Sequence, residues 1–214
     1  MNGDVGDMQD LSDLDRQPLA GLPPRERILR TASDLFYRFS IHTVGIDRII
    51  AESGVAKMTF YKHFPSKAQL VAEYLRHKTL IWMGMLTTAT EPPDLSPPDR
   101  VLAVFDALDV SFRRPPFRGC PFVKGLAEFG PDADSPEIKA TIAAYFEGLH
   151  EFVATLIAPV GVADPDRAVL QILSLIQGAI VMAQASPGQA IAAANRDLVE
   201  LILKPPVRTR DPLP

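Results

Sequence analysis

The segment from Ile46 to Phe64 constrains the fold of this chain more than any other part of the sequence. Ile46, Ile49 and Ile50 occupy positions i, i+3 and i+4, which gives one apolar face to a short helix. Gly54 follows this helix, and glycine adopts a positive φ without the steric cost of a Cβ. The segment therefore predicts two short helices joined by a turn at Gly54.

The second helix is expected to begin near Ala56. Phe60 and Phe64 are spaced to bury one face, which leaves the N-terminal residues Lys57, Met58 and Thr59 exposed and protruding. Two helices arranged in this way form a helix-turn-helix, whose second helix enters the major groove in many DNA-binding proteins. A tight helical hairpin with a glycine at its bend is the alternative interpretation.

The residues after this hairpin favour DNA as the partner. Proline follows Phe64, and Ser66 with Gln69 three residues later is typical of a helix N-cap and its capping-box partner. Lys67 lies between them, where a positive charge is unfavourable unless an anion lies nearby. A DNA phosphate would supply that anion.

The motifs Gly54-Val55, Thr59 to Phe64 and Ser66-Lys67 resemble the TetR family of bacterial transcriptional regulators, over roughly residues 25–75. This resemblance implies a recognition helix from Ala56 to His63. It assigns base-edge contacts to Lys57, Met58 and Thr59, and phosphate contacts to Tyr61, His63 and Lys67. The residues expected at the DNA interface are Gly45, Lys57, Met58, Thr59, Tyr61, Lys62, His63 and Lys67.

Three of the matched positions depart from the usual family pattern. Gly45 stands where a capping Thr is general, Ala56 where Ser is common, and Met58 where Gly is common. Glycine still serves as an N-cap at a cost of a few tenths of a kcal/mol. The other two differences change what the groove meets, so an operator sequence does not transfer from relatives.

Charge is distributed unevenly along the chain. Residues 23–78 contain ten basic and five acidic side chains, a net charge of +5, in a chain whose formal net charge is −4. The remainder therefore carries −9. A basic head on an acidic body binds DNA at one end only.

The helix expected from Pro24 onwards completes the head. It has an apolar stripe formed by Ile28, Leu29, Ala32, Leu35, Phe36 and Phe39. Arg25, Arg27 and Arg30 are expected to be exposed, either near the DNA backbone or as an ordinary solvated face.

The expected fold class is all-α, with a three-helix head and a larger helical domain for effector binding and dimerisation. Acidic residues without apolar patterning predict a disordered arm and argue against a secretory signal peptide. The predicted boundaries are 1–22 for the arm, 23–68 for the head, 69–203 for the helical domain and 204–214 for a proline-rich tail.

Prolines divide the larger domain into helices expected at about 66–90, 99–113, 121–129, 135–158, 164–185 and 187–203. Residues 168–183 are too short for a bilayer span and are expected to form a buried helix that needs cover on more than one side. Such regulators resemble one another in pairing their last two helices across a dimer, although packing within one chain is the alternative. The expected interface residues are Gln171, Ser174, Gly178, Met182, Ala194, Leu198 and Leu201.

The middle helices carry many large side chains, which either enclose a pocket for a small, largely apolar effector or form plain core. The expected lining residues are Trp82, Met85, Phe105, Phe112, Phe117, Cys120, Phe122, Tyr145 and Phe146.

Cys120 is the only cysteine, so it forms no intramolecular disulfide, and it is expected to be either a reactive thiolate or a buried thiol. His77 and His150 lack ligand spacing, so neither a metal site nor another cofactor is predicted. An all-helical enzyme with Cys120 as nucleophile and His77 or His150 as base is an alternative, as is a helical protein-interaction module. Neither alternative explains the basic residues of the head.

The sequence thus predicts a cytoplasmic, non-enzymatic homodimer that binds a palindromic operator on double-stranded DNA, with no membrane partner. Twofold symmetry would place two recognition helices on successive major-groove faces. Repression relieved by a small molecule is the expected mode of regulation.

Overall fold

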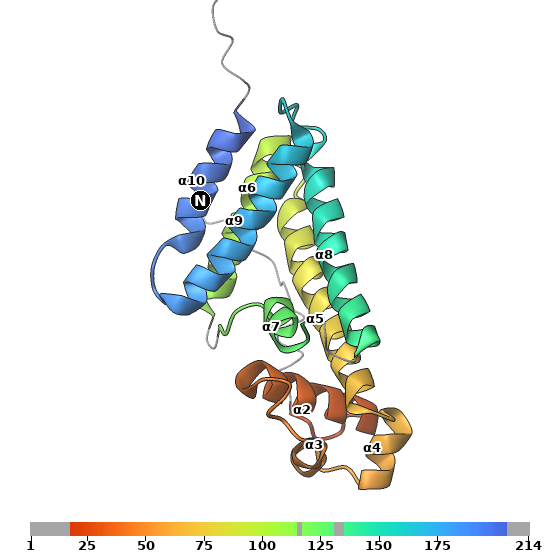
Figure 1. The fold of residues 1–214 in the computed structure, drawn as a ribbon. Coiled ribbons are helices and arrows are strands. Elements are labelled where there is room, and N and C mark those ends of the chain that lie inside the picture. The colour runs from red at the N-terminus through yellow and green to blue at the C-terminus, as the bar shows by residue number, and fades with distance from the viewer. Residues whose placement is uncertain (1–17, 115–116, 131–134, 205–214) are drawn as a thin grey trace, which may run out of the picture. The chain divides into compact units, whose positions relative to one another are not determined.

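The computed structural model describes residues 18–114, 117–130 and 135–204, and every regular element in these ranges is a helix. The helices are α2 (Pro24–Phe39), α3 (Ile46–Ser53), α4 (Lys57–His63), α5 (Lys67–Thr90), α6 (Pro97–Arg113), α7 (Pro121–Glu128), α8 (Pro136–Ile157), α9 (Pro165–Ala185) and α10 (Ile191–Leu203) (Figure 1). The all-α prediction is confirmed. Residues 1–17 and 205–214 of the predicted arm and tail lie outside the described ranges.

The chain divides into two compact units. The first contains residues 1–85 and 121–143, and the second contains residues 86–120 and 144–214. The first unit therefore joins the head to most of α5, to α7 and to the beginning of α8. This division by contacts differs from the functional boundary predicted between residues 68 and 69, which stays a prediction.

Side-chain caps and prolines explain where the helices begin. Ser96 Oγ accepts a hydrogen bond from Asp99 N at 3.4 Å before α6, and an Asp164 carboxylate oxygen accepts one from Arg167 N at 3.1 Å before α9. The Ser96 cap starts α6 at Pro97, slightly earlier than the sequence predicted. α10 begins later than expected, because Gly188 has a φ of 85° and occupies a turn.

The core of the head is built on α2, as its apolar stripe predicts. Ile28, Ala32, Leu35 and Phe36 are buried, and the Phe36 ring lies edge-on to that of Tyr74 in α5 at 5.5 Å. The prediction for Phe39 is wrong, because its side chain is 42% exposed. The guanidinium groups of its neighbours Arg38 and Arg48 lie over the Phe39 ring, 5.0 and 4.4 Å from its centroid. Cations rather than core side chains therefore cover this ring.

Ser40, immediately after α2, has an unusual backbone conformation. Its φ of 88° and ψ of 153° lie in a region that is almost exclusive to glycine. We expect Ser40→Gly to raise the free energy of unfolding by about 1 kcal/mol, because relief of strain exceeds the added freedom of the unfolded chain. Urea denaturation measures this change. Ser40→Ala keeps the strain and should give no gain; equal stabilisation by both substitutions would contradict this explanation.

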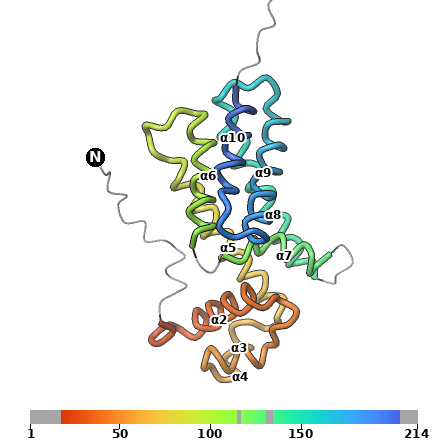
Figure 2. The backbone as a smooth tube through the Cα atoms, turned by 90° about the vertical axis from the view of Figure 1, so that its left-hand side faces the viewer, coloured from red at the N-terminus to blue at the C-terminus, as the bar shows by residue number. Residues whose placement is uncertain are grey.

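The second unit has its core between α6, α9 and α10, which pack against one another (Figure 2). Phe105 and Leu108 of α6, Ile172 and Ile176 of α9, and Val199 of α10 are fully buried. Only one face of α9 is covered in this way. Among the described residues, α9 is also the one helix long and apolar enough to cross a membrane, and core helices of soluble proteins pass the same test of length and composition.

Candidate nucleic-acid interface

The turn between α3 and α4 has the geometry that the sequence predicts. Gly54 has a φ of 64° and a ψ of 32°, and its N–H donates to the carbonyl groups of Ile50 and Ala51. A Cβ at Gly54 would lie 2.6 Å from Nη2 of Arg27. The left-handed backbone favours glycine here, and a Cβ would also displace the end of the Arg27 side chain from the turn.

The arginines at the start of α2 stabilise the head, which corrects the expectation that all three are exposed. Arg27 is half-buried and donates from Nη2 to the carbonyl oxygens of Ser53 and Gly54, which fixes the turn. Arg30 is buried. Arg25 remains exposed, with its guanidinium 5.3 Å from the centroid of the Phe64 ring.

An ion-pair cluster joins α2, α5 and α8 within the first unit. Glu73 pairs with both Arg25 and Arg76, and Arg76 also pairs with Glu137 at 3.2 Å. Partial burial tends to raise the pKa of Glu73, but hydrogen bonds and positive charge from Arg76 and Arg25 bring that pKa below its ordinary value. These two arginines are thus occupied by carboxylates, which makes them poorer candidates for phosphate contacts than the residues of α4.

α4 divides cleanly into a buried and an exposed side. Phe60 and the C-capping Phe64 are buried, as predicted. Lys57, Met58, Tyr61 and Lys62 are exposed, and Thr59 and His63 are half-buried. Met58 is the most exposed large apolar residue in the described part of the chain, with 86% of its surface accessible. Within the described residues, no carboxylate pairs with Lys62. The exposed side is therefore cationic, and its other lysine, Lys57, lies 3.7 Å from a carboxylate oxygen of Asp47 in α3.

The start of α5 adds a cation beside α4. Ser66 Oγ accepts a hydrogen bond from Gln69 N at 3.1 Å, which confirms the predicted cap. Lys67 is the first residue of the helix and is half-buried. Burial lowers the pKa of Lys67, and the negative charge of Glu128 opposes that shift. A phosphate at this helix N-terminus would also favour the charged lysine.

Sequence reasoning missed the contact of α7 with the head. The Glu128 carboxylate accepts hydrogen bonds from the backbone N–H groups of Ile41 and His42, and Lys124 Nζ donates to the Tyr37 carbonyl at 3.3 Å. The His42 ring also stacks near that of Phe129, with centroids 4.9 Å apart. No local pattern could have revealed these contacts, because the partners are more than 80 residues apart.

Residues 28–74 match the model of the bacterial regulatory proteins of the tetR family. The structure is similar to a TetR-family transcriptional regulator from Streptomyces coelicolor, with 32% identity, a TM-score of 0.77, and coverage of 84% of this chain and 94% of that chain. The chain belongs to the TetR family. It is a DNA-binding transcriptional regulator, with α3 and α4 as its helix-turn-helix.

Other solved structures agree with this TetR-family assignment. A putative tetR regulator from Streptomyces avermitilis is 25% identical, with a TM-score of 0.67, and the match covers 84% of this chain and 99% of that one. A putative regulator from Saccharomonospora viridis in complex with choline is 21% identical, with a TM-score of 0.66 and coverage of 82% and 93%. This second likeness concerns the fold alone. A comparison with curated proteins finds no match.

The residues predicted to line an effector pocket of this TetR-family protein fall in both units. In the second unit the rings of Phe112 and Phe117 lie 4.9 Å apart, and those of Tyr145 and Phe146 lie 5.1 Å apart. Phe105, Cys120, Phe122 and Tyr145 are buried, whereas Trp82, Met85, Phe112, Phe117 and Phe146 are half-buried. Their role as a pocket stays a prediction.

Cys120 immediately precedes α7, and its thiol is buried. His150 is exposed in α8, and His77 is half-buried in α5. Burial favours the neutral form of a thiol and makes it less reactive. The geometry of Cys120 thus gives no support to the alternative of a thiol enzyme.

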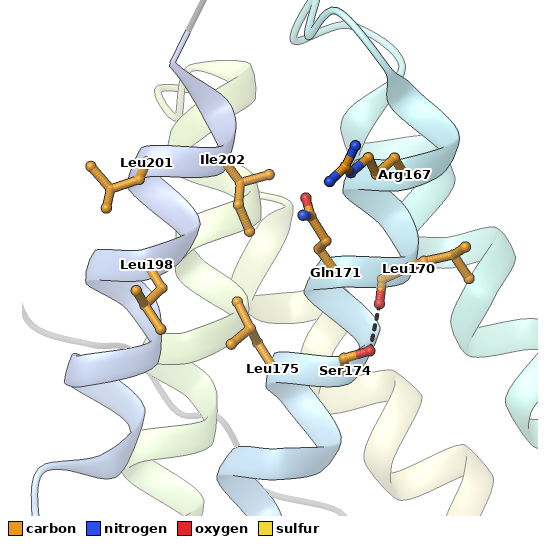
Figure 3. A pocket seen from close by; sticks show the side chains of 8 residues that line it. All are labelled: Arg167, Leu170, Gln171, Ser174, Leu175, Leu198, Leu201 and Ile202. Carbon is orange, nitrogen blue, oxygen red and sulfur yellow. Dashed lines mark hydrogen bonds between the residues drawn. The ribbon is translucent and has the colours of Figure 1, made fainter.

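The residues predicted for the dimer interface lie exposed on α9 and α10 of the single chain. They are Gln171, Ser174, Gly178, Met182, Ala194, Leu198 and Leu201. An open groove of about 600 Å³ follows this face (Figure 3). Its walls are Arg167, Leu170, Gln171, Ser174 and Leu175 from α9 and Leu198, Leu201 and Ile202 from α10.

Proposed function

We propose that this TetR-family regulator is a homodimeric repressor that binds a palindromic operator in the cytoplasm and is released by a small molecule. The observation that carries the DNA-binding part is the two-sided α4. Phe60 and Phe64 fix the helix to the head, while Lys57, Met58 and Tyr61 extend into solvent. A recognition helix requires this combination, since its base-reading side chains must be free of the core.

The side chains of α4 and its neighbours are proposed to make two kinds of contact with DNA. Lys57, Met58 and Thr59, at the N-terminal end of α4, are proposed to meet base edges. Tyr61, Lys62, His63 and Lys67, which follow along α4 and into α5, are proposed to hold phosphates. Gly45, the N-cap of α3, is proposed to let a phosphate approach the N–H groups at the start of that helix, since nothing lies within 4 Å of the position that its Cβ would occupy.

Dimerisation is proposed to occur through α9 and α10. Leu170, Val181 and Met182 of α9 and Leu198 and Leu201 of α10 are each about half exposed or more. Large apolar side chains gathered on two adjacent helices are typical of an interface. Gly178 lies among them with open space around its Cβ position, so a partner helix has room to approach closely. The boundary between the DNA-binding head and the helical domain is proposed to lie between residues 68 and 69.

The effector is proposed to bind among the large side chains of the helical body, within residues 69–203. The choline complex of one fold relative supports the proposal of a small-molecule site. Within the first unit, the Glu128 carboxylate provides a mechanical link, because it holds the N–H groups of the loop between α2 and α3. Movement of α7 on effector binding would thereby alter the head.

Substitutions at the proposed contacts should separate phosphate binding from base reading. Lys67→Ala is expected to weaken binding about 10-fold on every sequence and to reduce the salt dependence, since one charged contact is lost. Tyr61→Phe should weaken binding about 5-fold, again without a change in base preference. Lys57→Ala should both weaken binding and change the preferred base at one position per half-site.

Fluorescence anisotropy with operator and scrambled duplexes at several salt concentrations measures these effects. Lys139→Ala in α8 removes the same charge at a residue outside the proposed DNA contacts and is expected to bind as the wild type does. Wild-type affinity and base preference in all three head variants would eliminate α4 as the reading helix.

A further inference from the structure

An acidic side chain lies beside the proposed base-reading lysine. Asp47, in the first turn of α3, places Oδ1 3.7 Å from Nζ of Lys57 at the start of α4. The two side chains are 90% and 68% exposed, respectively. The surface of the head that carries Lys57 therefore presents an acceptor and a donor next to each other.

Stability gives little reason for this pair. Ion pairs between exposed side chains contribute about 0–1 kcal/mol, and Asp47 would serve the dipole of α3 equally well without reaching towards Lys57. On a surface that approaches phosphates, an unneutralised carboxylate opposes binding. Asp47 therefore reduces affinity for DNA in general. This cost is offset where the carboxylate makes a favourable contact with one particular base sequence.

We propose that Asp47 and Lys57 together read one G·C base pair in each half-site of the operator. Lys57 donates to the O6 and N7 acceptors of guanine, and Asp47 accepts from the N4 amino group of the paired cytosine. The major-groove edge of G·C presents two acceptors followed by a donor, which matches the lysine and carboxylate side by side. A·T presents an acceptor in place of that cytosine donor and would repel Asp47.

This inference rests on the proposed function, in which α4 enters the major groove. Asp47 itself belongs to α3, so it is a specificity residue outside the recognition helix. The local sequence does not indicate this role, because Asp47 and Lys57 belong to different helices and come together only through the turn at Gly54. Three-dimensional proximity alone assigns the carboxylate to the same base pair as the lysine.

The test is selection from a random duplex pool by full-length wild type, Asp47→Ala and Asp47→Asn. We expect a G·C pair at symmetry-related positions of the wild-type motif. Asp47→Ala should keep the palindrome, lose about 10-fold in discrimination at that pair, and bind nonspecific DNA more tightly. Asp47→Asn should shift the preference towards adenine, because the amide pairs with adenine N6 and N7.

Glu52→Gln is the matched control, since Glu52 is an exposed acid of the same helix that pairs with Arg48 at 2.7 Å instead. It should leave the motif unchanged, and melting temperatures should show that all variants are folded. An unchanged motif in both Asp47 variants, with only tighter binding, would overturn the inference while the proposed function stands. A wild-type protein that selects no palindrome would overturn both.

Discussion

Gly178→Arg is expected to convert the protein to monomers and to weaken operator binding at least about 100-fold. In a single chain, Gly178 is exposed and a Cβ added there meets nothing within 4 Å, so an arginine can extend into water. In the proposed dimer it would be a charge buried between helices without a partner. Two linked heads gain about 10²–10⁴ in affinity over one, and a monomer loses that gain. Analytical ultracentrifugation and anisotropy measure the two effects.

Gly148→Arg in α8 is the matched control. It is the same substitution at another helical glycine with open space around its Cβ position, and it lies outside α9 and α10. This variant should remain a dimer with wild-type affinity. A dimeric Gly178→Arg protein that binds its operator normally would exclude the proposed face as the interface.

Phe60→Ala is expected to destabilise the head by about 3–5 kcal/mol and to abolish specific DNA binding. Phe60 is fully buried, and its ring lies 5.3 Å from that of Tyr61 and 6.3 Å from that of Phe64. Its removal leaves a cavity under the helix that carries the proposed contacts. Because the head and the α9–α10 face belong to different compact units, the dimer should survive. Hydrogen exchange resolved by residue measures the loss of protection in the head.

Met58→Ala gives the comparison on the same helix. Met58 is 86% exposed, so its truncation should change stability by less than about 0.5 kcal/mol. Its effect should fall on DNA binding alone, through lost contact with a base. Normal operator affinity in Phe60→Ala, or unfolding of the head in Met58→Ala, would contradict the division of α4 into two sides.

The helix-turn-helix could be predicted from the sequence because each of its determinants is local. The apolar spacing in α3, the glycine at position 54 and the Ser66 cap act within a few residues of one another. The start of α2 was equally predictable, from the prolines at positions 23 and 24. The predicted start of α10 was too early, because Gly188 with its positive φ forms a turn before the helix begins at Ile191.

Tertiary contacts account for the predictions that were wrong or missing. Arg27 and Arg30 are arginines on the solvent side of a helical pattern, yet one binds the turn carbonyls and the other is buried. Phe39 fits the apolar stripe but is covered by two guanidinium groups. Glu128 reaches the head from a helix far along the chain. Periodicity describes one helix at a time and carries no information about such neighbours.

Most residues of the candidate site could be predicted from the sequence, but one of its charged residues could not. The sequence marked Lys57, Tyr61 and Lys67 as cations or donors on a recognition helix and its neighbour. It gave Asp47 no role, because the ion pair with Lys57 depends on the angle between α3 and α4. A side chain on the first helix of the hairpin thus enters the site only when the fold is known.

Selection of bound duplexes from a random DNA pool by the purified full-length protein tests the central claim most directly. A dimeric regulator with two α4 helices should enrich a palindrome whose half-sites are separated by about one helical turn or a multiple of it. The enrichment should fall steeply with salt, since phosphate contacts supply much of the affinity. Failure of the folded protein to enrich any sequence above nonspecific binding would contradict the account.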